Sequence, residues 1–301
     1  LSVWTTQYSI DFYEKMGHYA RIGGLEVART GDDTWMEEIK RKLSSAKAFG
    51  TRAHYVSPAE IKEKFPLIEE DQVQGGLFDP DAGLVIPRSQ TVAGKLVDAA
   101  EKTGKLQAFA NTPAKSLIVE GGRIKGVVTH RGTIMADHVI VCAGIWGRLI
   151  AEMVGEDLPV MPVDHPLTFF GPYNEFEGTG KEIGFPLLRD QGNSAYMRDT
   201  GDPKTTEGGQ IEWGYYEQTN PRLCHPRDIL EKHEARLSPS QRDLDMEQIL
   251  EPLEKAMELT PILGELGYNE GHSFNGLLQV SAAGGPSCGE SQKVRGLWYC
   301  V

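Results

Sequence analysis

His165 and Tyr196 are the first residues in this sequence whose types suggest chemistry. His165 stands between Asp164 and Pro166, where a region of short alternating runs begins, and Tyr196 lies within one of those runs. A histidine has an ordinary pKa of about 6.5, so it can take or release a proton near neutral pH. A tyrosine hydroxyl can hydrogen-bond a polar ligand. From the residues alone, an ordinary surface histidine and a sheet tyrosine remain the alternative interpretation.

A second candidate is an apolar run from Val139 to Cys142. It ends in Ala143 and Gly144 and leads into a helix-like segment that contains Trp146. A continuously apolar run predicts a strand covered on both faces, as in a parallel sheet. Where such a strand opens into a helix, free backbone N–H groups and the helix dipole can hold a phosphate. An ordinary buried strand followed by a turn fits the pattern equally well.

The third candidate is the glycine-rich turn formed by Gly284, Gly285 and Pro286. Glycine lets a backbone approach a flat ring closely, although a purely structural turn explains the same residues. No G-x-G-x-x-G fingerprint occurs in the 301 residues, and the glycines at 284–289 have the wrong spacing for one. The sequence therefore contains no complete dinucleotide-binding motif.

Other candidates are weaker, and none indicates a metal site or a nucleophilic triad. His225 and His233 do not form the H-E-x-x-H pattern of a zinc site, so a solvated charged surface is the better interpretation. Arg189 and Arg198 offer bidentate forks that suit a substrate carboxylate. Arginines exposed on the surface of a strand are the more common interpretation of these two residues.

The composition excludes several classes of protein. Hydrophobic residues make up 40% of the 301 residues, enough for the cores of two modest domains. The formal net charge of -12 disfavours nucleic acids and anionic membranes as partners, because both attract basic faces. No apolar run approaches the roughly 18 residues of a membrane-spanning helix. The four cysteines are far apart, so we expect reduced, packed thiols in a cytoplasmic protein.

The elements that must position these candidates are of two kinds. Residues 1–16 predict a helix with an aromatic stripe facing the core, and residues 88–103 predict a helix that ends at Gly104. The following run, 106–110, predicts a strand, so helix and strand would form one αβ unit. Residues 159–221 contain many glycines, prolines and short alternating runs, which predict an antiparallel sheet.

Local signals mark several element boundaries. The run Asp32-Asp33-Thr34 is expected to hold the N-cap of one helix, and Ser57 with Glu60 forms the capping-box pattern of another. Gly121 and Gly122 join two β-rich runs and predict a hairpin, because glycine accepts a positive φ without steric cost.

The longest pattern in the sequence resembles a known family. The phrase G-R-I-K-G-V-V-T…A-D-H-V-I-V-C-A-G-I-W at 122–146 is similar to the FAD-dependent amine oxidoreductases of the D-amino-acid oxidase superfamily. Within that superfamily the chain most resembles the dimethylglycine oxidase, dimethylglycine dehydrogenase and sarcosine dehydrogenase group. Further agreement with this group lies at 23–28, 57–60, 75–78, 274–276 and 284–291.

The resemblance implies a fold of the α/β plus α+β class. It would combine a partial Rossmann-type FAD-binding domain with an antiparallel-sheet substrate domain. Residues 1–16, 87–155 and 290–301 would belong to the FAD-binding domain, and residues 17–86 and 156–289 to the substrate domain. The missing fingerprint would lie before Leu1, so we expect a chain truncated at both ends that binds FAD weakly or not at all by itself.

The resemblance also assigns catalytic roles. His165 would help to set the protonation of an amine substrate, and Tyr196 would hydrogen-bond it. The amine must be neutral, because hydride leaves the carbon next to nitrogen only when the lone pair can support the iminium.

Cofactor contacts are implied in the same way. Ala143, Gly144 and Trp146 would contact FAD, as would Gly284, Gly285 and Pro286. Relatives often have an acidic residue just before these glycines, where this chain has Ala283. That departure places part of the site in question.

The implied function is the oxidation of an N-methyl amino acid, such as dimethylglycine or sarcosine, by hydride transfer to FAD. The partner is then a small-molecule amine, with no nucleic acid and no membrane. One alternative is another oxidase of the superfamily, acting on a D-amino acid or on glycerol 3-phosphate. The other is a non-catalytic flavoprotein-like fragment that associates as a homo-oligomer. Several relatives carry a C-terminal folate-binding domain, of which this sequence contains no part.

Overall fold

The computed structural model describes residues 2–205, 207–232, 240–282 and 284–301. The chain divides into two compact units. Unit 1 comprises Leu1–Leu106, Pro166–Gln218 and Leu244–Phe274, and unit 2 comprises Gln107–His165, Thr219–Asp243 and Asn275–Val301. The predicted division into an FAD-binding and a substrate domain follows other boundaries and stays a prediction.

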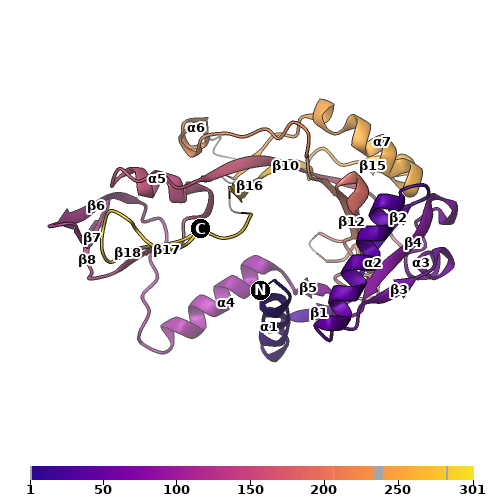
Figure 1. The fold of residues 1–301 in the computed structure, drawn as a ribbon, viewed down its shortest axis with the longest axis horizontal. Helices are drawn as coiled ribbons and strands as arrows, with labels where there is room; N and C mark the ends of the chain where they lie inside the picture. Colours follow the sequence, from indigo (N-terminus) through magenta and orange to yellow (C-terminus); the bar gives the residue numbers. More distant parts are fainter. Residues whose placement is uncertain (1, 206, 233–239, 283) are drawn as a thin grey trace. The chain divides into compact units, whose positions relative to one another are not determined.

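Unit 1 is built on a mixed but mainly antiparallel sheet (Figure 1). Its strands are β2 (Gly24–Arg29), β3 (His54–Val56), β4 (Val73–Asp79), β10 (Val160–Gly171, of which residues from Pro166 on belong to unit 1), β11 (Leu187–Asp190), β12 (Ala195–Asp199), β13 (Ile211–Tyr215) and β15 (Gly267–Tyr268). The order is β10-β13-β12-β11-β2-β4-β3, with β15 beside β10, and only β11 and β2 among these pairs run parallel. The antiparallel sheet predicted within 159–221 is confirmed.

The helices of unit 1 are α1 (Ser2–Lys15), α2 (Asp33–Ala48), α3 (Pro58–Lys64), α4 (Ser89–Glu101), α7 (Leu250–Leu259) and α8 (Ile262–Glu265), with the 3-10 turns η1 (Glu70–Gln72), η3 (Gln191–Asn193) and η4 (Met246–Gln248). Two of them, α2 and α3, begin at capping residues that the sequence predicts. Asp32 accepts the Trp35 N–H at 2.9 Å, and Ser57 and Glu60 form a complete capping box. Gly104 follows α4 with φ of +69°, as expected for a helix C-terminus.

The core of unit 1 lies between the sheet and its helices. In β12, alternate residues Ala195, Met197 and Asp199 are buried, so the remaining residues of this strand share the opposite face. Trp213 and Phe65 are among the largest fully buried side chains of the core. The apolar face of α7 packs against the same core.

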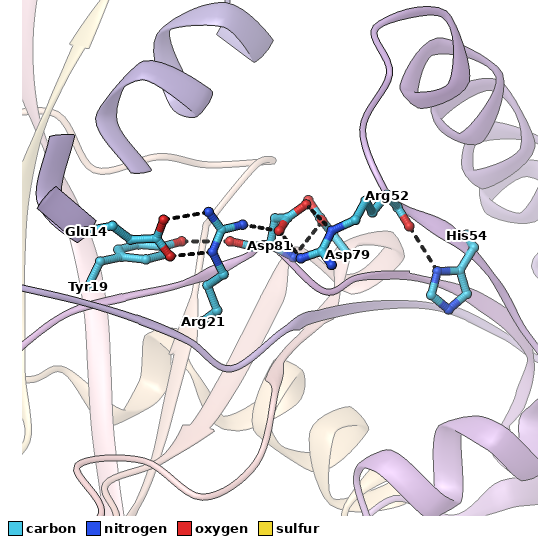
Figure 2. A network of polar contacts seen from close by, with 7 residues as sticks. All are labelled: Glu14, Tyr19, Arg21, Arg52, His54, Asp79 and Asp81. Carbon is cyan, nitrogen blue, oxygen red and sulfur yellow. Dashed lines mark hydrogen bonds and ion pairs between the residues drawn. The ribbon is translucent and has the colours of Figure 1, made fainter. Parts of the chain in front are cut away.

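A polar network in unit 1 ties α1 to a turn of the chain (Figure 2). Arg21, on β1 (Tyr19–Arg21), contacts both Glu14 of α1 and Asp81, which lies before β5 (Gly83–Val85). Arg52 binds the same Asp81 carboxylate, with its Nε 2.9 Å from Oδ2. These contacts hold the two-stranded sheet β1-β5 next to the end of α1.

The expectation of a core-facing aromatic stripe on α1 is wrong for the described residues. Trp4 is 65% exposed and Tyr8 is 61% exposed. The two rings stack on each other, with centroids 5.7 Å apart. The regular spacing therefore places aromatic rings side by side on the helix surface without covering them.

The described residues of unit 2 form three small groups of paired strands. Its strands are β6 (Ala114–Glu120), β7 (Arg123–Thr129), β8 (Gly132–Met135), β9 (Val139–Val141), β14 (Gln241–Arg242), β16 (Phe274–Ser281, with Asn275 onward in unit 2), β17 (Cys288–Glu290) and β18 (Leu297–Cys300). β6, β7 and β8 form an antiparallel sheet, and β14 pairs with β16. Gly121 and Gly122 both have positive φ, which confirms the predicted hairpin.

The third group is the three-stranded sheet β17-β18-β9, in which β18 and β9 run parallel. After β9 come the 3-10 turn η2 (Gly144–Trp146) and helix α5 (Gly147–Glu152), and α6 (Pro226–Lys232) lies later in the chain. The expected passage from a strand through Ala143 and Gly144 into a helix is thus confirmed.

Two local strand predictions are wrong. Ile140 in β9 is 64% exposed, so the strand is not covered on both faces by the described residues. Residues 106–110 form no strand, and Phe109 in this run is 55% exposed. An apolar run becomes a strand only where another strand pairs with it, and these residues have no such neighbour within the described chain.

Candidate functional site

Tyr196 lies on a polar face of the unit 1 sheet. On β12 it stands opposite Gly214 of β13 and opposite Arg189 of β11. A Cβ built on Gly214 would lie 2.2 Å from Cζ of Tyr196 and 2.3 Å from its hydroxyl oxygen. Gly214 therefore leaves the space that the tyrosine ring fills. The ring also packs against Tyr216, with centroids 5.6 Å apart.

Arg198 and Glu212 form an ion pair on the same face of the sheet. They are direct cross-strand neighbours of β12 and β13. The Arg198 Nε lies 2.9 Å and its Nη2 2.5 Å from Oε2 of Glu212. The Glu212 side chain is 8% exposed and that of Arg198 is 27% exposed. Because little solvent reaches the two side chains, this charge-assisted contact is well suited to hold both of them in place.

A cavity of about 440 Å³ opens beside this ion pair in unit 1. Its charged lining comprises Arg88, Glu182, Arg198, Glu207 and Glu212. Arg88 also forms an ion pair with Glu207. The cavity therefore presents guanidinium and carboxylate groups together, which suits a small ligand that carries both an ammonium and a carboxylate.

The environment shifts the pKa of two groups on this face. Burial, followed by the negative charge of Glu212, raises the pKa of the Tyr196 hydroxyl above its ordinary value of 10.0. Burial lowers the pKa of Arg198, but the Glu212 carboxylate outweighs this effect and the net shift is upward. The Tyr196 hydroxyl is protonated at neutral pH even at its ordinary pKa, so it can donate a hydrogen bond, and the upward shift extends this state to higher pH.

His165 belongs to unit 2, on the first half of β10, whereas Tyr196 belongs to unit 1. The histidine is 8% exposed, so the surface alternative is wrong. Its backbone N–H donates to Oδ1 of Asn275 at 2.8 Å. The neighbouring Asp164 accepts from Arg242 at 3.4 Å. A buried amide side chain and a half-buried ion pair thus hold this part of the strand.

The strand end at Ala143 and Gly144 carries buried polar atoms that suit a ligand. Gly144 has φ of +50°, and a Cβ built on it would meet only Oε1 of Gln279, at 4.0 Å. Within the described part of the chain, this oxygen and Nε1 of Trp146 are buried without a hydrogen-bond partner. An acceptor and a donor left in this way normally find a partner in water or a ligand.

The glycine loop of unit 2 is exposed and shaped by its own residues. Gly284 has φ of +66°, and no described atom lies within 4 Å of a Cβ built on Gly284 or Gly285. The Ser281 hydroxyl accepts the Gly285 N–H at 3.2 Å and donates to the carbonyl of the same residue. Pro286 is exposed. Ala283 lies outside the described residues.

The structure brings together some predicted residues and adds others. Tyr196 shares one face with Arg189 and Arg198, and Trp146 follows Gly144 in one turn. Sequence reasoning missed Glu212, Gly214 and Gln279. A glycine inside the strand at 211–215 was a usable signal, because such a glycine often marks a close approach of another group.

No metal centre or membrane-spanning helix is present in the described parts of the chain. His225 contacts Glu152, with Nε2 3.0 Å from Oε1, and His233 lies outside the described residues. No group of three or more metal-ligating side chains occurs among residues that the structure describes. Within the same residues, no helix combines the length and the apolar character needed to cross a bilayer.

Comparison with known proteins links the chain to flavoenzymes. The family model described as "DAO: FAD dependent oxidoreductase" matches residues 5–301. The mitochondrial dimethylglycine dehydrogenase of Rattus norvegicus is 26% identical over 97% of this chain and 33% of its own length. The mitochondrial sarcosine dehydrogenase of Homo sapiens is 27% identical over 92% of this chain and 28% of its own length.

Solved structures share the fold. L-proline dehydrogenase from P. horikoshii superposes with a TM-score of 0.76 at 21% identity, over 98% of this chain and 71% of that chain. The predicted fold class is confirmed by this likeness. The chain itself spans about a third of the length of the curated dehydrogenases it matches.

Proposed function

Because the chain belongs to the DAO family of FAD-dependent oxidoreductases, we propose that it takes part in oxidising an N-methyl amino acid. Dimethylglycine and sarcosine are the model substrates. The main support is the match of more than nine-tenths of this chain to dehydrogenases named for these two compounds. Both compounds combine an N-methylated amine with a carboxylate. The activity of the whole protein is part of this proposal, since the chain covers only a third of each relative.

The cavity of unit 1 supports this class of substrate. Arg88 and Arg198 can bind a carboxylate, and Glu182, Glu207 and Glu212 can bind an ammonium group. Of the charged groups that line the cavity, carboxylates outnumber guanidinium groups. A zwitterionic amino acid is therefore a better match than glycerol 3-phosphate, whose charge is only negative.

Two side chains carry the proposed polar chemistry. Tyr196 donates a hydrogen bond to the substrate through its hydroxyl, whose pKa burial raises above the ordinary value of 10.0. His165 takes the proton of the substrate ammonium, since only the neutral amine can release a hydride from its neighbouring carbon.

FAD would supply the hydride acceptor when it is bound. The groups in unit 2 that fit such a cofactor are Nε1 of Trp146 and Oε1 of Gln279, which are buried and lack partners among the described residues. Gly144, Gly284 and Gly285 leave room for a ring to approach the backbone. Ala143 and Pro286 complete the proposed contacts. The weak FAD binding expected of residues 1–301 alone stays a prediction.

The test is anaerobic reduction of a flavin-loaded preparation of the protein. Dimethylglycine or sarcosine should bleach the flavin absorbance, while a D-amino acid and glycerol 3-phosphate should not. Tyr196→Phe should slow bleaching, and Tyr268→Phe, a change at a tyrosine that is 38% exposed, should not. Bleaching by glycerol 3-phosphate or a D-amino acid alone would replace the proposed substrate class. Because weak FAD binding is expected of residues 1–301 alone, the test uses the full-length protein, and a full-length protein that stays a colourless oligomer and takes up no FAD would favour the non-catalytic alternative.

A further inference from the structure

Two thiols face each other across the edge of the three-stranded sheet of unit 2. Cys288 of β17 and Cys300 of β18 are direct cross-strand partners. Their Sγ atoms lie 3.6 Å apart. Both residues are exposed and carry free thiols. The prediction of separate, packed cysteines is wrong for these two residues, because a separation of 12 residues gives no local sign of strand pairing.

The type of strand pairing favours a covalent bond between these residues. The neighbouring residues Ser287 and Val301 exchange two backbone hydrogen bonds, at 2.6 and 3.2 Å. In an antiparallel pair, hydrogen-bonded and non-hydrogen-bonded pairs alternate, so Cys288 and Cys300 occupy a non-hydrogen-bonded pair. The Cα atoms of such pairs are about 4.5 Å apart and their side chains approach closely. Disulfides span Cα distances of about 4.4 to 6.8 Å, so the backbone already meets this requirement.

Small reagents can reach the pair. Cys288 lines a cavity of about 630 Å³ in unit 2, together with Glu156, Lys293 and Tyr299. The hydrogen bond with Cys300 raises the pKa of the Cys288 thiol. A thiol with a raised pKa forms less thiolate, so its oxidation is slow. Joining the two sulfurs removes two electrons and therefore requires an oxidant.

We propose that Cys288 and Cys300 are an oxidation site that closes to a cross-strand disulfide in the presence of hydrogen peroxide. One thiolate attacks the peroxide, the O–O bond breaks, and a sulfenic acid and hydroxide form. The second thiol then attacks the sulfenic sulfur, the S–S bond forms and water leaves. In sum, two thiols lose two hydrogen atoms, and one peroxide is reduced to two molecules of water.

The bond would act on the loop that precedes β17. Gly284, Gly285 and Pro286 lie a few residues before Cys288, and their loop is exposed. A disulfide fastens the end of this loop to β18, so it restricts how far the loop can move. This loop also belongs to the proposed FAD contacts, but the thiol chemistry is tested separately from amine oxidation, because it is followed at other residues and with another reagent.

Cys142 is the competing thiol. It lies one residue past β9, and β9 pairs with β18 so that Val141 stands beside Tyr299. Its register therefore places it next to Cys300 on the opposite side from Cys288. Cys288 and Cys300 form the antiparallel, non-hydrogen-bonded pair, in which the side chains approach each other closely. We therefore expect the bond to form between these two residues.

The experiment treats residues 1–301 with hydrogen peroxide and then blocks the remaining thiols with an alkylating reagent. Mass spectrometry of unreduced peptides should show residues 288 and 300 linked, with the loss of two hydrogen atoms, and a reducing agent should reverse the link. Two of the four thiols should then resist alkylation. Cys288→Ser and Cys300→Ser should each abolish the link, while Cys142→Ser and Cys224→Ser should keep it.

Three results would overturn the proposal. The first is a link from Cys300 to Cys142 in place of Cys288. The second is oxidation of single cysteines to sulfinic acid without any link. The third is a native protein in which neither Cys288 nor Cys300 reacts with the alkylating reagent before oxidation, which would contradict the exposure on which the site depends.

Discussion

Arg198 and Glu212 lie directly opposite each other on neighbouring strands, and two guanidinium nitrogens share one carboxylate oxygen at 2.9 and 2.5 Å. The pair borders both the cavity of unit 1 and the position of Tyr196. Removing the charge of Arg198 or Glu212 leaves the opposite charge without its partner, at a position that little solvent reaches. The stability of this sheet and the properties of the cavity are therefore coupled.

Glu212→Gln should lower the free energy of unfolding by about 3 kcal/mol, the lower end of the range for a broken buried pair, because Arg198 retains some exposure. Denaturant unfolding followed by circular dichroism measures the change. Glu38→Gln, which removes a partner of Arg41 on the surface of α2, should leave stability unchanged within error. The double variant with Arg198→Met should recover part of the loss. Strict additivity of the two changes would contradict a coupled pair.

Gly214→Ala should displace the Tyr196 ring, because the added Cβ would fall 2.2 Å from Cζ of that ring. Overpacking of this kind costs about 1–3 kcal/mol. Thermal unfolding measures the cost, and a double variant with Tyr196→Ala should cost less than the sum of the single changes. The matched control is Gly94→Ala in α4, where a Cβ meets nothing within 4 Å. That change should stabilise the helix slightly. Equal effects of both glycine changes would argue against a clash.

Tyr196 should make the protein sensitive to alkaline pH. Its pKa in the folded chain is raised above the ordinary value of 10.0 by burial and by Glu212. A raised folded pKa contributes stability that is complete below the unfolded pKa and is lost as pH rises through the folded pKa. The free energy of unfolding should be measured from neutral pH to pH 11. Above pH 10 it should fall more steeply for the wild type than for Tyr196→Phe. Parallel curves for the two proteins would contradict the shift.

Asn275→Ala should destabilise unit 2, because it removes the acceptor of the buried His165 N–H at 2.8 Å. A buried donor left without a partner costs about 1–3 kcal/mol. Hydrogen exchange at the His165 amide should become faster, which local opening explains and a remote effect does not. Asn174→Ala, at an exposed asparagine, should change stability by less than about 0.5 kcal/mol. Unchanged exchange at residue 165 would show that the contact contributes little.

Several residues of the candidate site could be predicted from the sequence, but the residues that stand opposite them could not. Tyr196, Arg189 and Arg198 each stood out by residue type, and the structure places them on one face of one sheet. Glu212 and Gly214 passed unnoticed, because their importance comes from what stands opposite them. The register of two strands decides such pairs, and register depends on contacts along both strands.

The sequence by itself determined the features that neighbouring residues control. Ser57 and Glu60 define a helix start, Gly121 and Gly122 define a hairpin, and Gly144 marks where β9 turns toward a helix. Each depends on backbone angles and hydrogen bonds within a few residues, so composition and spacing suffice to predict it.

Only the tertiary structure decided which faces are covered and which distant groups meet. Trp4 and Ile140 follow patterns typical of buried residues, yet both are exposed in the described chain. Cys288 and Cys300 give no motif, yet strand pairing sets their sulfur atoms 3.6 Å apart. Burial and cross-strand contact depend on chain segments remote in sequence, and a local pattern carries no information about where those segments pack.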